Sequence, residues 1–290
     1  MSSFQGTKIN PTRFDKSQIK FYVILVIMSS VMVLPLIYIF SQAFKPIDEL
    51  FAYPPKFFVK NPSLSNFSNL IAMMGTSEVP IARYFFNSII STVLTIVFSL
   101  TISAMAGYAL AKKRFRSKDF VFDMNTMALM FVPTAVMIPK YLIISGMQLN
   151  TSFWVHIIPA LALPVGLFLV KQFMEQIPDA LIEAAKLDGA SEMNIFFNII
   201  IPLSKAPLAT VAILTFQSAW NATEASSLYL ADESLKNFAF YMTTLTTTGN
   251  DVVGQGMAAA ATLIMFIPNL IIFVVMQKQV MDTMAHSGIK

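Results

Sequence analysis

Long apolar stretches alternate with short polar connections along most of the chain. A helix needs about 20 apolar residues to cross the ~30 Å hydrocarbon core of a bilayer. Six stretches are candidates, at residues 21–44, 84–111, 120–144, 153–170, 200–219 and 257–276. The pattern therefore predicts an all-α integral membrane protein with six transmembrane helices. We expect the first stretch to stay as a span, because its apolar run is too long for a signal peptide.

Polar segments surround and divide the expected membrane domain, residues 21–278. We interpret residues 1–20 and 279–290 as tails. The connections at 45–83 and 221–255 exceed the ~12–15 residues above which loops are usually functional or disordered. We therefore expect both connections to contact an external partner. The first is expected to contain a short surface helix at residues 64–74.

A polar island interrupts the apolar pattern at about residues 178–199. Pro178 suits the first turn of a helix, where its missing N–H has no helical partner. Gly189 can adopt the left-handed conformation that ends a helix, and Ser191 can cap the next one. We therefore expect two short helices broken at Gly189. They form an elbow whose two neighbouring alanines leave a low surface for another protein to dock.

Composition and charge place the chain in lipid and orient it. It is 56% hydrophobic and only 12% charged, whereas soluble domains carry about 25% charged residues. We assign 14 of its 20 lysines and arginines to the side that holds both tails and the elbow. Cytoplasmic loops are enriched in these residues, so both termini and the elbow are expected in the cytoplasm. Five of the 14 lie at 112–118, a cluster that we interpret only as a topology signal.

Ionisable side chains are almost absent from the six stretches. We expect Lys140 to extend its amine to the outer interface, and His156 to be interfacial or satisfied locally. Ion-coupled transporters usually keep intramembrane carboxylates or histidines, so the energy should come from elsewhere. The chain has no cysteine and no Walker-type phosphate loop. We therefore expect a non-catalytic conduit that binds no metal or other cofactor itself and needs a separate motor.

Four prolines, Pro133, Pro139, Pro159 and Pro164, interrupt the third and fourth stretches. Broken helices can line a polar path or act as hinges in membrane proteins. Ordinary kinks explain the same prolines equally well, so both interpretations stay open.

The elbow carries a spaced pattern, in which Glu183-Ala-Ala is followed after three residues by Gly189-Ala and later by Pro202 and Pro207. This pattern resembles the EAA loop of the binding-protein-dependent ABC importers. In that family the elbow is the coupling helix, which sits in a cleft of the cytoplasmic ATPase subunit. The resemblance implies a set of ATPase-coupling residues: Glu183, Ala184, Ala185, Asp188, Gly189 and Ala190.

Other segments are similar to carbohydrate permeases of the same family. Asn87-Ser88 opens the second stretch, Trp220-Asn221 ends the fifth, and residues 287–290 are similar to the tail of the maltose-type second permease. Residues 222–225 depart from the usual aromatic and proline run. This departure weakens the transfer of sugar contacts from the family.

The resemblance implies a type I ABC importer permease fold in a bacterial cytoplasmic membrane. This chain and a second, different permease would form a heterodimeric pathway for oligosaccharides in the lipid bilayer. Two ATP-binding cassette subunits would bind ATP and magnesium, and an extracytoplasmic solute-binding protein would deliver the solute. No nucleic acid is expected among the partners.

The same resemblance, together with chemistry, suggests three further groups of site residues. His286, Ser287 and Gly288 would contact the ATPase, unless the tail is simply frayed. Sugars are held by hydrogen-bonding groups and aromatic faces, so a substrate pathway is expected at the outer half of the bundle; the alternative is that these polar residues cap helices and satisfy one another. Its candidates are Asn87, Ser88, Gln217, Ser218, Trp220, Asn221 and Glu224, and the candidates for contacting the binding protein are Tyr229, Phe238, Phe240 and Tyr241.

Three other classes of function are compatible with parts of the sequence. A type I importer for polyamine, phosphate or peptide would share the elbow, but not the features at 220–221 and 287–290. A secondary transporter or channel would depend on membrane potential without an ATPase. A membrane enzyme or scaffold is disfavoured because the spans lack a catalytic group. Residues 281–287 resemble permeases for acidic glycan fragments.

Overall fold

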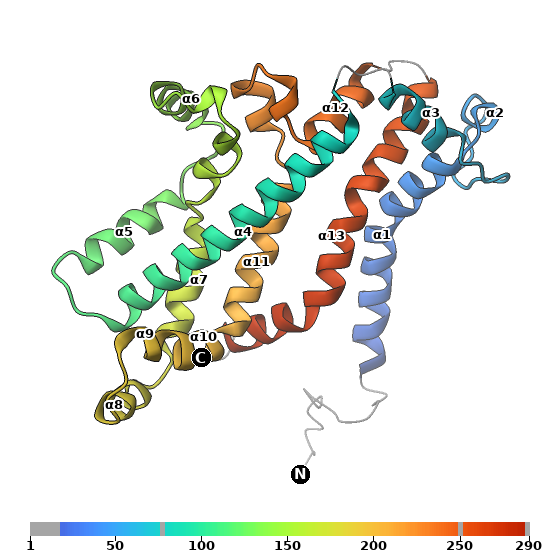
Figure 1. Cartoon of the computed structure of the whole chain (residues 1–290). Helices are drawn as coiled ribbons and strands as arrows, with labels where there is room; N and C mark the ends of the chain where they lie inside the picture. Colours follow the sequence, from blue (N-terminus) through green and yellow to red (C-terminus); the bar gives the residue numbers. More distant parts are fainter. Residues whose placement is uncertain (1–17, 76–78, 249–251, 288–290) are drawn as a thin grey trace, which may run out of the picture. The chain divides into compact units, whose positions relative to one another are not determined.

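A computed structural model describes residues 18–75, 79–248 and 252–287 of the chain, and this part is helical without a strand (Figure 1). The chain divides into two compact units. The first comprises Met1–Ala72 with Thr246–Leu263, and the second comprises Met73–Leu245 with Ile264–Lys290.

The first unit contains α1 (Ile19–Phe44), α2 (Ile47–Leu50), most of α3 (Ser65–Met74) and the start of α13 (Val252–Ser287). The buried Asn66 side chain donates hydrogen bonds to the carbonyls of Ala43 and Lys45, at 3.0 and 2.8 Å. These are carbonyls at the end of α1, which have no partner within that helix. The expected short helix at 64–74 is confirmed by α3.

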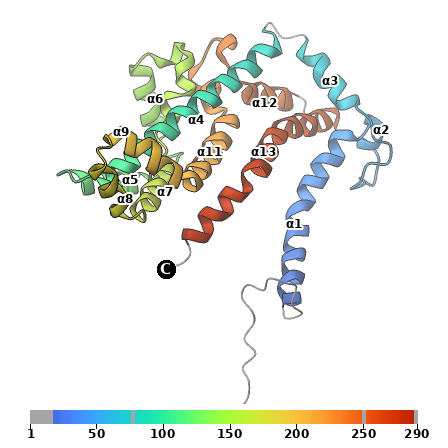
Figure 2. The same cartoon turned by 60° about the horizontal axis from the view of Figure 1, so that its bottom comes forward.

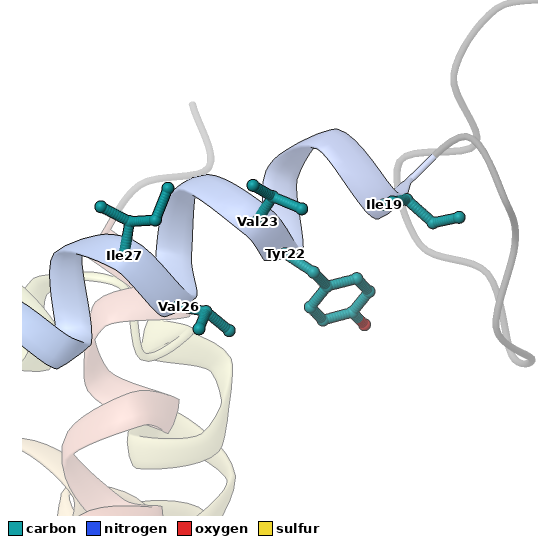
Figure 3. Close-up of a pocket in the computed structure, with 5 residues that line it drawn as sticks. All are labelled: Ile19, Tyr22, Val23, Val26 and Ile27. Carbon is teal, nitrogen blue, oxygen red and sulfur yellow. The ribbon is translucent and has the colours of Figure 1, made fainter.

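Most of the apolar surface of α1 is uncovered, since its most apolar stretch has no buried residue. Five residues of its first turns line a shallow groove, seen in Figure 3. All of the lining residues come from α1 itself and none contributes a charge. The groove is therefore a helix surface suited to lipid or to another apolar helix.

The second unit is built around α4 (Ile81–Lys112), which packs against α7 (Pro164–Glu175) and α11 (Lys205–Trp220). Small residues bring the helices together: a Cβ added to Gly107 would lie 2.8 Å from Cγ1 of Val170. Val170, Met174 and Val211 are completely buried in the resulting core. These three helices form the frame on which the other elements of the unit are mounted.

Three described helices are long and apolar enough to cross a membrane, Ile19–Phe44, Ile81–Lys112 and Gly254–Lys278, or five if two bent pairs each count as one span. The pairs are Phe153–Ala160 with Pro164–Glu175, bent by 42°, and Glu192–Leu203 with Lys205–Tyr229, bent by 79°. The count of six spans therefore stays a prediction.

The expected third stretch is broken, and prolines coincide with the break. Residues 120–144 are divided between α5 (Lys118–Ala128) and α6 (Met137–Gly146), with Pro133 between them. The expected fourth stretch, residues 153–170, is broken as well: it begins with two short 3-10 turns, η3 (Phe153–His156) and η4 (Ile158–Ala160), and continues in α7 from Pro164. Another 3-10 turn, η2 (Leu149–Thr151), precedes it.

The expected loop at 221–255 is largely folded, which corrects the sequence interpretation. It contains a π-helical turn η6 (Ala225–Tyr229), a 3-10 turn η7 (Glu233–Leu235) and α12 (Phe238–Thr248). Its aromatic side chains are mostly buried, and their burial holds the segment against the frame.

Candidate functional site

The elbow at residues 178–199 has the expected helix–glycine–helix form. It consists of α8 (Asp179–Leu187) and α9 (Glu192–Ile195), followed by the π-helical turn η5 (Phe196–Ile200) and α10 (Ile201–Leu203). Figure 1 shows α8 and α9 at one end of α4, and Figure 2 shows them near the end of α7. Pro178 precedes α8 as its extended N-cap residue rather than lying in the first turn, which corrects that expectation by one position.

Backbone hydrogen bonds define the bend. Gly189 has a φ of +81°, a value that L side chains adopt rarely. The N–H of Ala190 donates to the carbonyl of Ala185 at 2.9 Å, and the N–H of Gly189 to that of Lys186 at 3.0 Å. This pair of bonds is the Schellman ending of a helix. The next helix is capped by Ser191, whose hydroxyl accepts from the N–H of Asn194 at 3.3 Å.

The surface of the elbow is polar and low, with one apolar protrusion. Glu183, Ala184, Asp188 and Gly189 are exposed, while Ala185 and Ala190 are half-buried against the frame. Leu187 is 91% exposed. The sequence interpretation missed Leu187, although its signal was present: it lies five residues after the buried Ile182, off the helix face that Ile182 shares with positions 185 and 186.

Two lysines at the end of α4 bind the elbow, and with their acidic partners we name them the lysine clasp. Lys112 is nearly buried, and its Nζ lies 2.7 Å from Oδ1 of Asp179, the first residue of α8. The same Nζ donates to the carbonyls of Ile177, at 2.5 Å, and Glu175, at 3.3 Å. The hydrogen bond and charge of Lys112 lower the pKa of Asp179.

The second half of the clasp is centred on Glu192, the first residue of α9. Its carboxylate forms ion pairs with Lys113 and with Lys186, the latter at 3.1 Å. It also accepts a hydrogen bond from the hydroxyl of Tyr108 at 3.1 Å. Lys112 and Lys113 were interpreted only as part of a topology signal; the structure corrects this, because both make specific ion pairs with the elbow.

The opposite end of α4 holds the segment 233–238 mainly by hydrogen bonds from buried neutral side chains to the backbone, a contact that we name the distal clamp. Beside it, Nε of Arg83 donates to the carbonyl of Ser234 at 3.2 Å, and the Tyr84 hydroxyl donates to Glu233 at 3.1 Å. The buried Asn87 side chain donates to the carbonyls of Ser234 and Lys236, at 2.9 and 2.8 Å. The buried Ser88 hydroxyl accepts from the N–H of Phe238 at 2.9 Å. Asn87 and Ser88 were candidates for the substrate pathway, but in this conformation they are used inside the chain, as the structural alternative anticipated.

Four other pathway candidates lie near the end of α11. Trp220 is buried and donates from Nε1 to the carbonyl of Met265 at 3.2 Å. Gln217, Ser218 and Asn221 are exposed. The Asn221 amide donates to the carbonyl of Gln217 at 2.8 Å and lies 3.4 Å from Oδ1 of Asn269. Asn269 was missed by the sequence interpretation because it stands alone in an apolar run.

Glu224 forms a charged pair that the sequence did not suggest. Nζ of Lys140 lies 3.0 Å from both carboxylate oxygens of Glu224, and the Tyr229 hydroxyl donates to Oε1 at 2.9 Å. Lys140 therefore has a partner within the protein, which corrects the expectation that its amine extends to the membrane interface. The Lys140 side chain also lines an otherwise apolar cavity of about 340 Å³ beside Pro139 and Pro159.

The aromatic candidates for contacting a binding protein face inward. Tyr229, Phe238 and Tyr241 are buried, and Phe240 is half-buried with Nζ of Lys236 4.7 Å from its ring centre. They hold segment 221–248 in place, and a contact with another protein would be made by its exposed residues, such as Leu228 and Asp232. The contact itself stays a prediction.

Two remaining expectations concern histidines. His156 is buried and its Nε2 lies 3.0 Å from the carbonyl of Leu235, so it is satisfied locally as expected. The C-terminal contact at His286, Ser287 and Gly288 lies outside the described side chains, and Gly288 lies outside the described residues altogether.

Apolar helices of membrane-spanning length, with a polar elbow between two bent spans, define a polytopic helical membrane protein. The chain belongs to the binding-protein-dependent transport system inner membrane component family, whose model matches residues 100–280. It is thus a permease component of an ABC transporter in the inner membrane.

Relatives of known name match almost the whole chain. The "Probable ABC transporter permease protein YurM" of Bacillus subtilis (strain 168) is 31% identical over 259 residues, 88% of this chain and 83% of the relative. The arabinooligosaccharides transport system permease protein AraQ of Halalkalibacterium halodurans is 28% identical over 89% of this chain and 91% of its own length. The sn-glycerol-3-phosphate transport system permease protein UgpE of Escherichia coli (strain K12) is 28% identical over 89% of this chain and 92% of its own length.

A solved structure confirms the permease fold. A chain in the crystal structure of a bacterial ABC transporter involved in the import of the acidic polysaccharide alginate superposes with a TM-score of 0.72 at 21% identity, over 93% of this chain and 99% of that one. A second match, with a TM-score of 0.55 at 13% identity, comes from a bacterial alginate ABC transporter in complex with an alginate pentasaccharide-bound periplasmic protein.

Proposed function

We propose that this chain is the permease subunit of an ATP-driven importer for oligosaccharides and forms half of a heterodimeric pathway with a second permease. The observation that carries this proposal is the exposed elbow, bent at Gly189, in a chain of the binding-protein-dependent family. Two of the matched proteins are named for saccharide transport, of arabinooligosaccharides and of alginate.

The elbow is the part that docks to the ATPase. Glu183 offers a carboxylate for a charge-assisted hydrogen bond to a basic group, and Leu187 offers an exposed apolar side chain for a pocket. Ala184 between them lets the two proteins approach closely. ATP and magnesium are held by the partner ATPase, and this chain contributes no catalytic group.

The excess of lysine and arginine on one side supports a cytoplasmic position for the elbow and both termini. The distal clamp end of α4 then faces outward, where the solute-binding protein arrives. Polar groups available to a passing solute include the exposed Gln217 and Asn221, the half-buried Asn269, and the half-buried Lys140–Glu224 pair. Such groups hold a sugar through hydrogen bonds that can be exchanged for water, so the solute can be released.

The test is ATP-driven uptake by the full transporter reconstituted in proteoliposomes with its binding protein. Glu183→Ala and Gly189→Val should assemble but abolish uptake, since the first removes the docking carboxylate and the second strains the bend. Asp119→Ala is the matched control, because it removes an exposed carboxylate of α5 that lies outside the elbow, and it should lose less. Normal uptake by both Glu183→Ala and Gly189→Val would refute the docking role, and binding of only non-saccharide solutes would refute the substrate class.

A further inference from the structure

The elbow is attached to its unit by an apolar patch. Ile182, Ile195 and Phe196 are buried in the core cluster of the unit, and Ala185 and Ala190 pack against that cluster. The connection from α7 to α8 is only residues 176–178, and α8 is exposed along most of its length. Apolar contacts are non-directional, so directional contacts are needed to fix the angle between the elbow and α4.

The lysine clasp supplies those contacts at three successive places. Nζ of Lys112 binds the carbonyl of Glu175 at the end of α7, the carbonyl of Ile177 in the connection, and Asp179 at the start of α8. Lys113 binds Glu192 at the start of α9. Both acids occupy the first position of their helix, where a negative charge also interacts favourably with the helix dipole.

The arrangement joins each elbow helix, at its first residue, to the same end of α4. The other end of α4 holds segment 233–238 through the distal clamp. A displacement of the elbow is therefore carried along one 32-residue helix to that segment.

We propose that Lys112 and Lys113 are positioning residues that make the elbow and α4 move as one body, so that work done on the elbow reaches the far end of α4. This inference rests on the proposed function, because it assigns the route by which docking at the elbow is coupled to the pathway. It predicts that the clasp stays closed throughout the transport cycle.

A role of Lys113 in folding alone can be separated from a role in coupling. The Lys113–Glu192 ion pair is substantially exposed: 35% of the Lys113 side chain and 52% of the Glu192 side chain are accessible to solvent. Exposed pairs of this kind contribute little to folding stability. Loss of Lys113 should therefore leave an assembled transporter whose defect is in coupling.

The decisive experiment replaces the Lys113–Glu192 pair by a covalent bridge. The chain has no cysteine, so Lys113→Cys with Glu192→Cys introduces the only two thiols in this subunit. The complete transporter, with its other cysteines replaced, is assembled in proteoliposomes and supplied with a loaded binding protein. Uptake and ATP hydrolysis are measured together, before and after treatment with a bifunctional thiol reagent.

In the double variant before bridging, the number of solute molecules imported per ATP hydrolysed should be about tenfold lower than in the unmodified transporter, while ATP hydrolysis continues. A tenfold change lies within the usual range of coupling between sites. Bridging after assembly should restore the ratio, an effect that a folding role could not produce. Lys113→Gln and Lys112→Gln should show the same loss, whereas Arg116→Gln, exposed in the same turn, should not.

Three results would overturn the proposal: an unchanged ratio in the unbridged double variant, bridging that blocks transport, or equal losses in Arg116→Gln. If the double variant does not assemble, the ratio in Lys113→Gln decides alone. Failure of the unmodified transporter to import any solute would refute the proposed function instead.

Discussion

The two ends of α4 are held by different chemistry. At the elbow end, lysines pair with carboxylates whose side chains are largely exposed, 73% for Asp179 and 52% for Glu192. At the distal end, the neutral side chains of Asn87 and Ser88 bind backbone groups and are buried. Exposed charges can exchange partners with water at little cost, while a buried amide cannot. The comparison indicates that the distal clamp serves mainly stability and the lysine clasp mainly coupling.

The largest expected loss of stability follows from breaking the distal clamp. Asn87→Leu removes the donor to the carbonyl of Lys236 and one of two donors to the carbonyl of Ser234, which keeps Nε of Arg83 at 3.2 Å. A lost hydrogen bond costs about 0.5–1.5 kcal/mol and a buried carbonyl left without a partner about 1–3 kcal/mol, so the free energy of unfolding should fall by about 2–4 kcal/mol, measured by chemical unfolding in detergent. Asn221→Leu, at an exposed amide, is the control; equal losses in both variants would contradict the role of burial.

A second loss is expected where α4 meets α7, just before the lysine clasp. Gly107→Ala places a Cβ 2.8 Å from Cγ1 of Val170, and overpacking of this kind costs about 1–3 kcal/mol. Thermal unfolding should show a lower Tm than for the unmodified protein. Gly146→Ala meets no atom within 4 Å and should not lower it; a similar drop in both would show that helix spacing is not set at Gly107.

Lys113→Gln should cost less stability than either change above. Lys113 and Glu192 are partly exposed, and such pairs contribute roughly 0.2–1 kcal/mol, reduced by salt. The difference in Tm from the unmodified protein should shrink as salt is raised. A loss as large as that of Asn87→Leu would remove the distinction between the two ends of α4.

The smallest expected effect is the pH dependence of the Lys112–Asp179 pair. Lys112 lowers the pKa of Asp179 below its ordinary value. The stabilisation is therefore complete above about pH 4 and is lost as pH falls through the lowered pKa. The Tm difference between Asp179→Asn and the unmodified protein should be present at neutral pH and vanish in acid. A difference that persists unchanged in acid would show that the pair is not its source.

Much of the secondary structure was predictable because its causes are local. Apolar runs predicted the helices, Gly189 and Ser191 predicted the bend and the next cap, and Pro133 coincides with the break in the third stretch. The resemblance at 183–190 was likewise a local pattern; the family match over residues 100–280 confirms the family, and the coupling role of these residues stays a prediction.

The contacts of the site were beyond sequence reasoning because they join distant positions. Asn87 binds residues that lie 147 and 149 positions further along the chain. Tyr108 and Glu192 are 84 positions apart in the sequence, and so are Lys140 and Glu224. The same residue types would have suited a solute pathway, an interface or a topology signal.

The sequence by itself determined that this chain is a helical membrane protein with a bent polar elbow, since hydrophobic length and backbone preference act over a few neighbouring residues; the permease class came from the family resemblance. Only the tertiary structure decided which polar groups remain available to other molecules. Segment 233–238 packs on α4 at the buried Asn87 and Ser88, and the packing of α4 against α7 brings Lys112 and Lys113 to the elbow. The cost of burying an unpaired polar group then requires each of them to find a partner within the chain.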